Sequence, residues 1–553
     1  MFVQKKNNPK QILAKLRGLM KPPNVQVQAT SSSIKILRDV HIPTRDGSYL
    51  SANIYMPLYA GTFPAIISLH PGRKDVVCKD GYMHIQLHFA RQPDQIAFSD
   101  ETSFEAPDPN FWVSNGYVVI NIDKRGFGIS PKAKEPQVYF GQQEIEDIYD
   151  AIEWAGVQPW SNGRVGLLGV SYLAINQYKV AAMNPPHLKA IIPWEGVSDL
   201  YKDWFYPGGV QEVGFTPFLF SRLQTFGDGF DMGKEQAERP TRDEWWQSFV
   251  ADFEQIKLPM LNCISFASQM MHTRGSQRVY QRAGSQQKWL YTHRGGEWTA
   301  YYSAEVNALM LKFFDHFLKG IDNGMDKHPK VRLEIREFGD KVKEVRYESQ
   351  WPPANVTWQS FYLDSRQEAL RAVAAAPDSK ITFELAKGSA HYSYIFDRDT
   401  EIVGPMKLTI YVELDGCDDA NLFAGIQKFH NGREVNFDGT YGFPNDIVTK
   451  TAQRVALRTI NENLSTPTSP DHDFDTVRPL QEGEVARMEL QFEPSATFFR
   501  KGDELRLVLQ GRYFISGLKV NQPFAYKKSN RGKCTIHTST LYPSELLLPM
   551  LEK

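Results

Sequence analysis

One change of pattern limits the folds open to this chain of 553 residues. Up to about residue 320, short apolar runs alternate with segments of helical spacing, as in RVGLLGV, LAINQYKVAAM and LKAIIPWEG between residues 164 and 196. Such alternation predicts a parallel sheet with crossover helices. From about residue 330 the helical spacing is absent, and short alternating runs such as VRLEIREF and MKLTIYVEL predict an all-β sandwich or jelly roll.

A second break falls inside the α/β part. Residues 198–255 are rich in aromatic residues and glycine and interrupt the alternation, which resumes at LPMLNCISF, so they are interpreted as an inserted cap. The predicted division of the chain is an N-terminal arm (1–35), an α/β domain (36–197 and 256–328), the cap (198–255) and a β-sandwich domain (329–553). In the arm, KQILAKLRGLM is interpreted as an amphipathic helix docked on the body. The basic, acid-free arm also resembles a mitochondrial transit peptide, so a mitochondrial location stands beside the expected cytoplasmic one.

Composition narrows the range of partners. Lys plus Arg (63) nearly equals Asp plus Glu (64), which argues against a nucleic acid, and no apolar run reaches the roughly 20 residues that span a membrane. No cysteine belongs to a CxxC pair, so neither a disulfide framework nor a zinc site is expected. We expect an apolar small-molecule substrate and no metal or cofactor. The sequence leaves open whether the chain forms a homo-oligomer.

The stretch GRVGLLGVSYLAINQ (163–177) places Ser171 where a predicted strand turns into a predicted helix. A serine at such a corner stands above the sheet edge beside backbone N–H groups that can hold an oxyanion, as a nucleophile requires. The alternative is that Ser171 only caps the helix.

The stretch IEWAGVQPWSNGRVGLLGVSYLAINQ resembles the CocE/NonD hydrolases, which are related to X-prolyl dipeptidyl aminopeptidases. Further matches in the same order are RDGSYLSANIYMP, DKRGFGIS, WEGVSDLYKDWFYPGG, HTRGS and FFDHFLKGIDNGM, so that the resemblance covers residues 36–520. It implies an α/β-hydrolase domain with an inserted helical cap and a C-terminal jelly roll of galactose-binding type. It also implies hydrolysis of esters and amides through Ser, His and Asp, with a Tyr hydroxyl in the oxyanion hole.

Carried over residue by residue, the resemblance makes Ser171 the nucleophile and gives the backbone N–H of Tyr172 to the oxyanion hole. His293, in KWLYTHRGGEW after a late strand, takes the place of the general base, although an ordinary loop histidine is the alternative. Leu173 is within the family pattern, whereas Ala174 replaces its final glycine.

Two family residues are missing. The acid of a W-x-D pattern lies four residues before His272, where this chain has Ser268, and a P-Y-G-K-D pattern is replaced by HPGRKD, with Gly72 in place of the Tyr. A site lacking both is expected to be a poor ordinary hydrolase. Glu195 could reach His293 as a substitute acid, Ser268 could bond the imidazole without supplying charge, and Glu297 is expected in solvent. Substitute oxyanion donors are Arg73, His70 and the N–H of Gly72.

The aromatic residues of the cap allow two interpretations. They line an apolar substrate pocket, or they pack the cap against the body; they are Trp204, Tyr206, Phe215, Phe218, Phe220, Trp245 and Trp246.

Three functions fit the sequence. The first is acyl chemistry, in which Ser171 attacks an ester, thioester or amide and His293 shuttles the proton; the outcome is hydrolysis or acyl transfer, as in ring closure of a secondary metabolite. The second is a non-hydrolytic cyclisation or elimination with His293 as base. The third is a catalytically silent binding protein.

Overall fold

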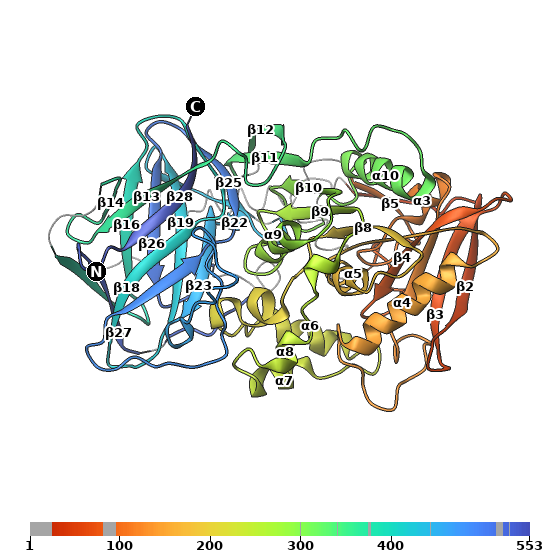
Figure 1. Cartoon of the computed structure of the whole chain (residues 1–553), viewed down its shortest axis with the longest axis horizontal. Helices are drawn as coiled ribbons and strands as arrows, with labels where there is room; N and C mark the ends of the chain where they lie inside the picture. The colour runs from red at the N-terminus through yellow and green to blue at the C-terminus, as the bar shows by residue number, and fades with distance from the viewer. Residues whose placement is uncertain are drawn as a thin grey trace.

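The computed structural model describes residues 25–80, 96–298, 300–339, 341–373, 378–442, 444–515, 524–529 and 531–552. An α/β part and a β-rich part lie side by side along the long axis (Figure 1). The helix expected at residues 10–20 lies outside the described residues. Among the residues described, no helix has the length and apolar character needed to cross a membrane.

The α/β part is built on one mixed sheet with the strand order β2, β3, β6, β4, β7, β8, β9, β10, β11, β12. Neighbours from β6 to β11 run parallel, while the pairs at the two ends run antiparallel. The runs FPAIISLH and VVINID are buried throughout, as expected of parallel strands covered on both faces. The bounds are β2 (Ile34–Pro43), β3 (Tyr49–Pro57), β4 (Phe63–His70), β6 (Val118–Asp123), β7 (Ser161–Val170), β8 (Leu188–Trp194), β9 (Met260–Ser265), β10 (Lys288–His293), β11 (Val331–Phe338) and β12 (Lys341–Glu348).

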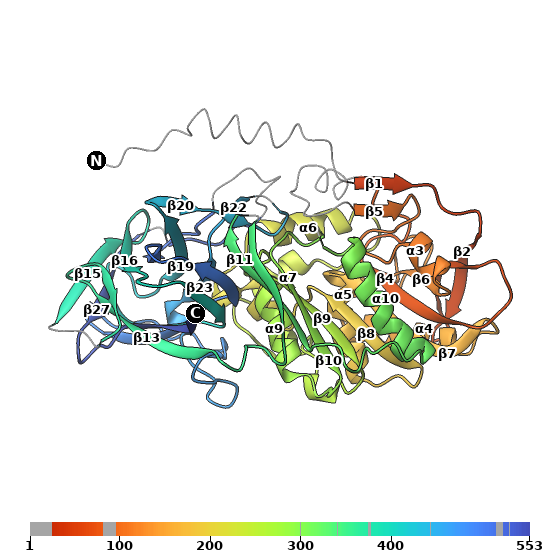
Figure 2. The same ribbon diagram turned by 90° about the horizontal axis from the view of Figure 1, so that it is seen from above.

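Helices cover both faces of this sheet. The apolar residues of α3 (Pro109–Ser114) and α10 (Ala304–Lys319) pack on one face, and Figure 2 shows α10 lying along it. Those of α4 (Gln142–Gly156), α5 (Tyr172–Ala182) and α9 (Thr273–Arg282) pack on the other. This layered arrangement confirms the α/β-hydrolase fold class, and residues 34–57 form an antiparallel hairpin of β2 and β3.

The segment after β8 is helical and breaks the alternation, as expected. It contains η1 (Leu200–Phe205), η2 (Pro207–Gly209), α6 (Phe215–Leu223), α7 (Met232–Glu238), α8 (Glu244–Gln247) and η3 (Phe253–Gln255). It also contacts the β-rich part, where the amide of Val213 bonds to the carbonyl of Ala525 at 2.6 Å. The exact domain boundaries given above stay predictions.

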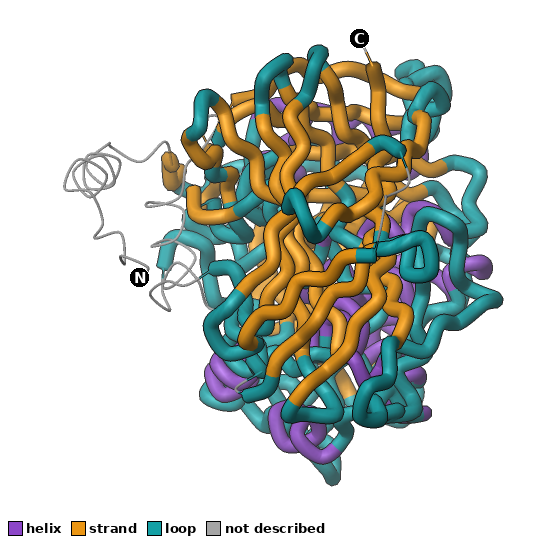
Figure 3. The backbone as a smooth tube through the Cα atoms, turned by 90° about the vertical axis from the view of Figure 1, so that its left-hand side faces the viewer, coloured by secondary structure: helices purple, strands orange, loops and turns teal. Residues whose placement is uncertain are grey.

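The β-rich part consists mainly of strands (Figure 3). These strands pack around one apolar core. One sheet includes β16, β26, β19 and β23; facing strands include β15, β27, β18 and β24, while β28 joins β13, β17 and β18. A bridge between Arg336 on β11 and Thr497 on β25 links the two parts. The bounds are β13 (Thr357–Asp364), β15 (Ser379–Glu384), β16 (Ser389–Ile395), β17 (Thr400–Gly404), β18 (Lys407–Asp415), β19 (Asn421–His430), β23 (Thr449–Arg454), β24 (Ala486–Gln491), β25 (Ser495–Phe499), β26 (Glu504–Gln510), β27 (Lys533–Thr538) and β28 (Glu545–Glu552).

Candidate active site

Ser171 occupies a strained corner between β7 and α5. Its φ of 54° and ψ of −110° lie in a region that non-glycine residues rarely adopt. A Cβ on Gly169 would lie 2.4 Å from the Cβ of Leu173, so the glycine leaves the room that Leu173 fills. This explains how the corner forms although a leucine stands two residues after the serine. The corner has the shape of a nucleophile elbow.

The histidine in contact with Ser171 is His272, which directly precedes α9. Its Nε2 lies 3.1 Å from the Ser171 Oγ, and its Nδ1 lies 3.0 Å from the Ser268 Oγ. Because Nδ1 also faces two carboxyl groups, we assign the proton to Nδ1, which leaves Nε2 free to accept the serine proton. Burial lowers the pKa of His272 to about 3, so the imidazole is neutral at physiological pH.

His293 lies elsewhere. Its Nε2 is 3.0 Å from the Oε1 of Glu195, and its ring stacks on Trp194 with a centroid distance of 5.9 Å. The predicted contact between Glu195 and His293 is therefore present. The predicted pairing of Ser171 with His293 is not the one observed, because the turn between β9 and α9 brings His272 over the same sheet edge. Ser268 likewise bonds His272 rather than His293.

Three buried glutamates surround the pair of Ser171 and His272. The Oε1 of Glu297 lies 3.7 Å and the Oε2 of Glu195 lies 4.0 Å from the Nδ1 of His272. The expectation that Glu297 sits in solvent is wrong, since only 4% of its side chain is exposed; the loop after β10 folds inward over the strand ends. Glu105 completes the group, and its Oε1 accepts a hydrogen bond from the Trp298 indole at 2.8 Å.

The three carboxyl groups affect one another's ionisation. Burial raises the pKa of Glu297 to about 8, and the Ser171 hydroxyl acts in the opposite direction. Burial, and then the charge of Glu297, raise the pKa values of Glu105 and Glu195 well above the ordinary range. The Ser268 hydroxyl lowers that of Glu195, which fits a hydroxyl that accepts from His272 and donates toward Glu195. The site thus holds three carboxyl groups that keep their protons to higher pH than an ordinary glutamate, and the pKa of Glu297 is about 8.

Backbone strain is concentrated at the same place. Besides Ser171, positive φ angles occur at Glu105 (62°), Glu195 (56°) and Met270 (60°). Each such residue costs about 1–3 kcal/mol and persists only where the surrounding structure enforces it. The surrounding structure therefore holds the turns around Ser171 in these strained conformations.

The oxyanion side of the site is only partly as predicted. Tyr172 is the first residue of α5, so its N–H has no acceptor within the helix, as the predicted role requires. Its hydroxyl donates to Glu144 at 2.9 Å. A Cβ on Gly72 would lie 3.3 Å from the Phe226 ring, so the space for a side chain at this position is taken by the cap.

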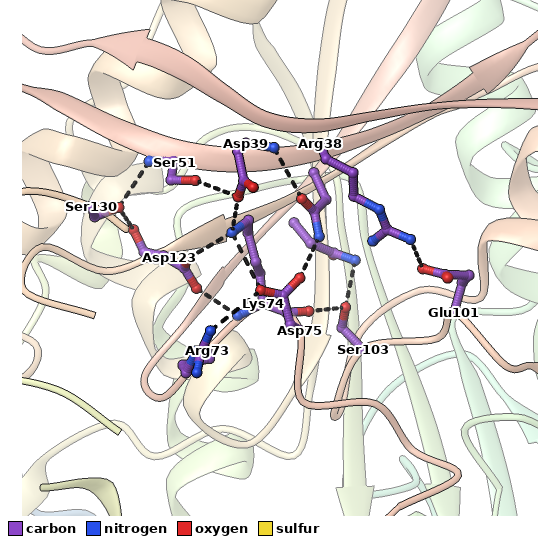
Figure 4. Close-up of polar contacts among 12 residues, drawn as sticks. Arg38, Asp39, Ser51, Arg73, Lys74, Asp75, Glu101, Ser103, Asp123 and Ser130 are labelled. Carbon is purple, nitrogen blue, oxygen red and sulfur yellow. Dashed lines mark hydrogen bonds and ion pairs between the residues drawn. The ribbon is translucent and has the colours of Figure 1, made fainter. Parts of the chain in front are cut away.

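An ion-pair network anchors the loop after β4 (Figure 4). The buried Nζ of Lys74 lies 2.8 Å from Asp123 and 2.8 Å from Asp39. Arg73 is exposed, and its guanidinium group forms an ion pair with Asp75 of the same loop at 3.9 Å. His70 is buried, and burial lowers its pKa to about 4. Lys74 thus fixes the loop, whereas Arg73 and His70 are not brought to Ser171 by any described contact.

The cap aromatics form one cluster beside the corner. Trp204, Tyr206, Phe215, Phe220 and Trp246 are buried together with Tyr172 and Leu173 of α5. Phe218 is exposed, and Trp245 is partly buried against the cluster. The indole N–H of Trp204 has no hydrogen-bond partner in the described structure, although it is buried. Packing is therefore established for most of these rings.

Two protein-family models match the chain: X-Pro dipeptidyl-peptidase (S15 family) over residues 46–225, and X-Pro dipeptidyl-peptidase C-terminal non-catalytic domain over residues 323–547. The crystal structure of a CocE/NonD family hydrolase from Staphylococcus aureus superposes with a TM-score of 0.88 at 33% sequence identity, over 97% of this chain and 100% of that one. This chain belongs to the CocE/NonD hydrolase family.

More distant relatives agree with this placement. Cocaine esterase from Rhodococcus sp. (strain MB1 Bresler) is 22% identical over 94% of this chain and 99% of its own length. Xaa-Pro dipeptidyl-peptidase from Streptococcus sanguinis (strain SK36) is 22% identical over 87% of this chain and 75% of its own length. An α-amino acid ester hydrolase shares the fold, with a TM-score of 0.70 at 15% identity. The chain is a serine hydrolase of the CocE/NonD and S15 group.

Sequence reasoning missed His272 and Glu105 as site residues. The position of His272 carried a usable signal, because it follows β9, and the carboxyl ends of parallel strands converge on one edge of the sheet. The same rule applies to Glu297 after β10. Glu105 follows no strand of the central sheet, and nothing in its sequence context separates it from an ordinary loop glutamate.

Proposed function

We propose that the chain hydrolyses esters of apolar small molecules, with Ser171 as nucleophile and His272, rather than His293, as general base. The observation that carries this is the 3.1 Å contact between the Ser171 Oγ and the His272 Nε2 at a strained elbow. Esterases and Xaa-Pro dipeptidyl-peptidases among the relatives act on acyl groups, which is consistent with acyl chemistry here.

The mechanism follows from these positions. The Ser171 Oγ attacks the carbonyl carbon as its proton passes to the His272 Nε2, and the Tyr172 N–H meets the developing oxyanion. The imidazolium then gives this proton to the leaving alcohol, and an acyl ester on Ser171 results. Water attacks that ester by the same steps in reverse, with His272 again as the base.

The acid function is divided among neighbours. A typical triad holds the imidazole with one carboxylate, which fixes its tautomer and stabilises the imidazolium. In this chain the Ser268 hydroxyl takes the hydrogen-bonding position, while the carboxyl groups of Glu297 and Glu195 supply charge from 3.7 and 4.0 Å. Because these groups ionise late, the hydrolase is slow at neutral pH and faster in mild alkali.

The cap cluster around Trp204 borders the acyl side of the site in this proposal, since Tyr172 belongs to both the elbow and the cluster. The acyl pocket is therefore apolar. Acyl transfer to an alcohol or amine uses the same acyl-enzyme and is the alternative fate of that intermediate. A role of this protein in secondary metabolism and its location in the cytoplasm stay predictions.

A chromogenic p-nitrophenyl ester tests the proposal. We expect steady-state release of p-nitrophenol by the wild type and loss of turnover in Ser171→Ala, with both proteins equally folded by circular dichroism. A Ser171→Ala variant that keeps full turnover would refute the acyl mechanism and favour a non-hydrolytic reaction or a silent binding protein.

A further inference from the structure

Three side chains of the types that bind metal ions meet beside the elbow, and they come from adjacent strands. They are Glu195 after β8, Cys263 on β9 and His293 at the end of β10. One nitrogen, oxygen or sulfur atom of each lies within 4.8 Å of those of the other two, and all three residues are buried. The register of the strands accounts for this, since Trp194, just before Glu195, and Tyr291 both lie opposite Cys263.

A polar atom in this cluster is left unused. The Nδ1 of His293 has no hydrogen-bond partner in the described structure, although the residue is buried, and the Glu195 Oε2 has no donor there other than the Ser268 hydroxyl. An unsatisfied buried polar group costs about 1–3 kcal/mol, more if charged, so each requires an explanation. The described hydrogen bond between the Nε2 of His293 and the Oε1 of Glu195 leaves the Nδ1 of His293 unexplained.

The charge around the cluster favours a cation. The carboxyl groups of Glu105 and Glu297 lie close enough to act electrostatically on Glu195. The positive charges of Arg332 and Arg294 act on His293, and both arginines are paired with Glu334. Three carboxyl groups therefore share a water-poor region that keeps them protonated, and a divalent cation bound there would favour their ionised forms.

The ligand set and the spacing select the ion. We propose that Glu195, Cys263 and His293 form a binding site for a borderline-soft divalent cation of the Zn²⁺ type, with water as fourth ligand. Zn–N and Zn–O bonds of about 2.0–2.1 Å and Zn–S bonds of about 2.3 Å place tetrahedral ligand atoms about 3.3–3.6 Å apart. The 3.0 Å separation of the His293 Nε2 from the Glu195 Oε1 is near this spacing, and the thiol needs to approach by up to about 1.3 Å.

Loading this site affects the serine chemistry, a consequence that rests on the proposed function. The cation binds the same Glu195 carboxyl group whose Oε2 lies 4.0 Å from the Nδ1 of His272. It cancels the negative charge that stabilises the imidazolium. Ester hydrolysis therefore falls when the site is loaded.

Cobalt is the spectroscopic probe. The full chain is expressed in medium supplemented with Co²⁺, and bound metal is measured by mass spectrometry together with the near-ultraviolet thiolate-to-cobalt charge-transfer band. We expect about one Co²⁺ per chain and a band that Cys263→Ser abolishes. Glu195→Gln, which keeps the side-chain shape, weakens metal retention in competition with a chelator by at least about tenfold. The matched control is Cys534→Ser, which alters an equally buried thiol of the β-rich part and leaves the band unchanged.

Two outcomes overturn the proposal. One is a wild type that retains no more Co²⁺ than Cys263→Ser when both are folded by circular dichroism. The other is a charge-transfer band that persists in Cys263→Ser or disappears in Cys534→Ser. Neither outcome depends on ester turnover, so a failed metal site and a failed esterase are told apart.

Discussion

The substitution Glu297→Gln separates the charge of Glu297 from its shape. The Glu297 carboxyl group is buried, and its pKa is raised to about 8 from an ordinary value of 4.5. A carboxyl group with a raised pKa binds its proton more tightly in the folded state than in the unfolded state. The stability that this proton contributes is fully present below pH 4.5 and is lost as the pH rises through 8.

The size of this loss follows from the two pKa values. At about 1.36 kcal/mol per pKa unit, Glu297 lowers the free energy of unfolding by about 1 kcal/mol at pH 5, about 3 kcal/mol at pH 7 and about 5 kcal/mol at pH 9. Glutamine carries no charge at any of these values. We therefore expect Glu297→Gln to be more stable than the wild type by an amount that grows from pH 5 to pH 9.

Melting scans and ester kinetics over this pH range provide the assay. We expect the apparent melting temperature of Glu297→Gln to exceed that of the wild type increasingly toward pH 9. Wild-type turnover should rise through about pH 8, because the ionised carboxylate lies 3.7 Å from the His272 Nδ1, where an opposite charge is worth about 4 kcal/mol at an effective dielectric constant of about 20. Turnover by Glu297→Gln should lack this rise. A melting difference independent of pH, or the same rise in both proteins, would refute the reasoning.

Three further substitutions probe neighbouring positions. Ser268→Asp places a carboxylate against the His272 Nδ1, and we expect a raised imidazole pKa and at least tenfold faster hydrolysis of an activated ester, measured as kcat against pH; a folded variant without either change argues against His272 as base. Gly72→Tyr combined with Phe226→Ala should restore an oxyanion donor and raise kcat by about 10–100-fold, whereas Gly72→Tyr alone gains nothing because Phe226 fills the space; equal kcat in both variants contradicts this. Trp204→Phe should raise KM for bulky acyl esters with little change in melting temperature, and unchanged KM would mean that the ring only packs the cap.

The layers of the fold follow from local pattern. Runs such as FPAIISLH have no polar face, so they fit only strands covered on both sides, and the alternating runs after residue 330 fit only half-buried strands. The position of Ser171 at a strand–helix corner is likewise predictable, because a strand and a helix flank it directly in the sequence.

The partners of Ser171 depend on long-range geometry. His272 and His293 both follow strands of the same sheet, and only the turn between β9 and α9 decides which ring reaches the serine. The burial of Glu297 depends on the path of the loop after β10, where the buried Trp298, Tyr301 and Tyr302 follow no strand or helix period. Substitution of the family acid by Ser268 was visible in the sequence, whereas its contact with His272 was not.

Labelling of Ser171 by a fluorophosphonate tests the pairing of Ser171 with His272 most directly. The rate of label formation, located by mass spectrometry, is compared in wild type, His272→Gln and His293→Gln, which change buried histidines to the same neutral side chain. We expect labelling to slow by at least about 10²-fold in His272→Gln, since a general base contributes about 10²–10⁴-fold, and to stay within about tenfold of wild type in His293→Gln. The opposite ranking in folded proteins would contradict the assignment of His272 as the base.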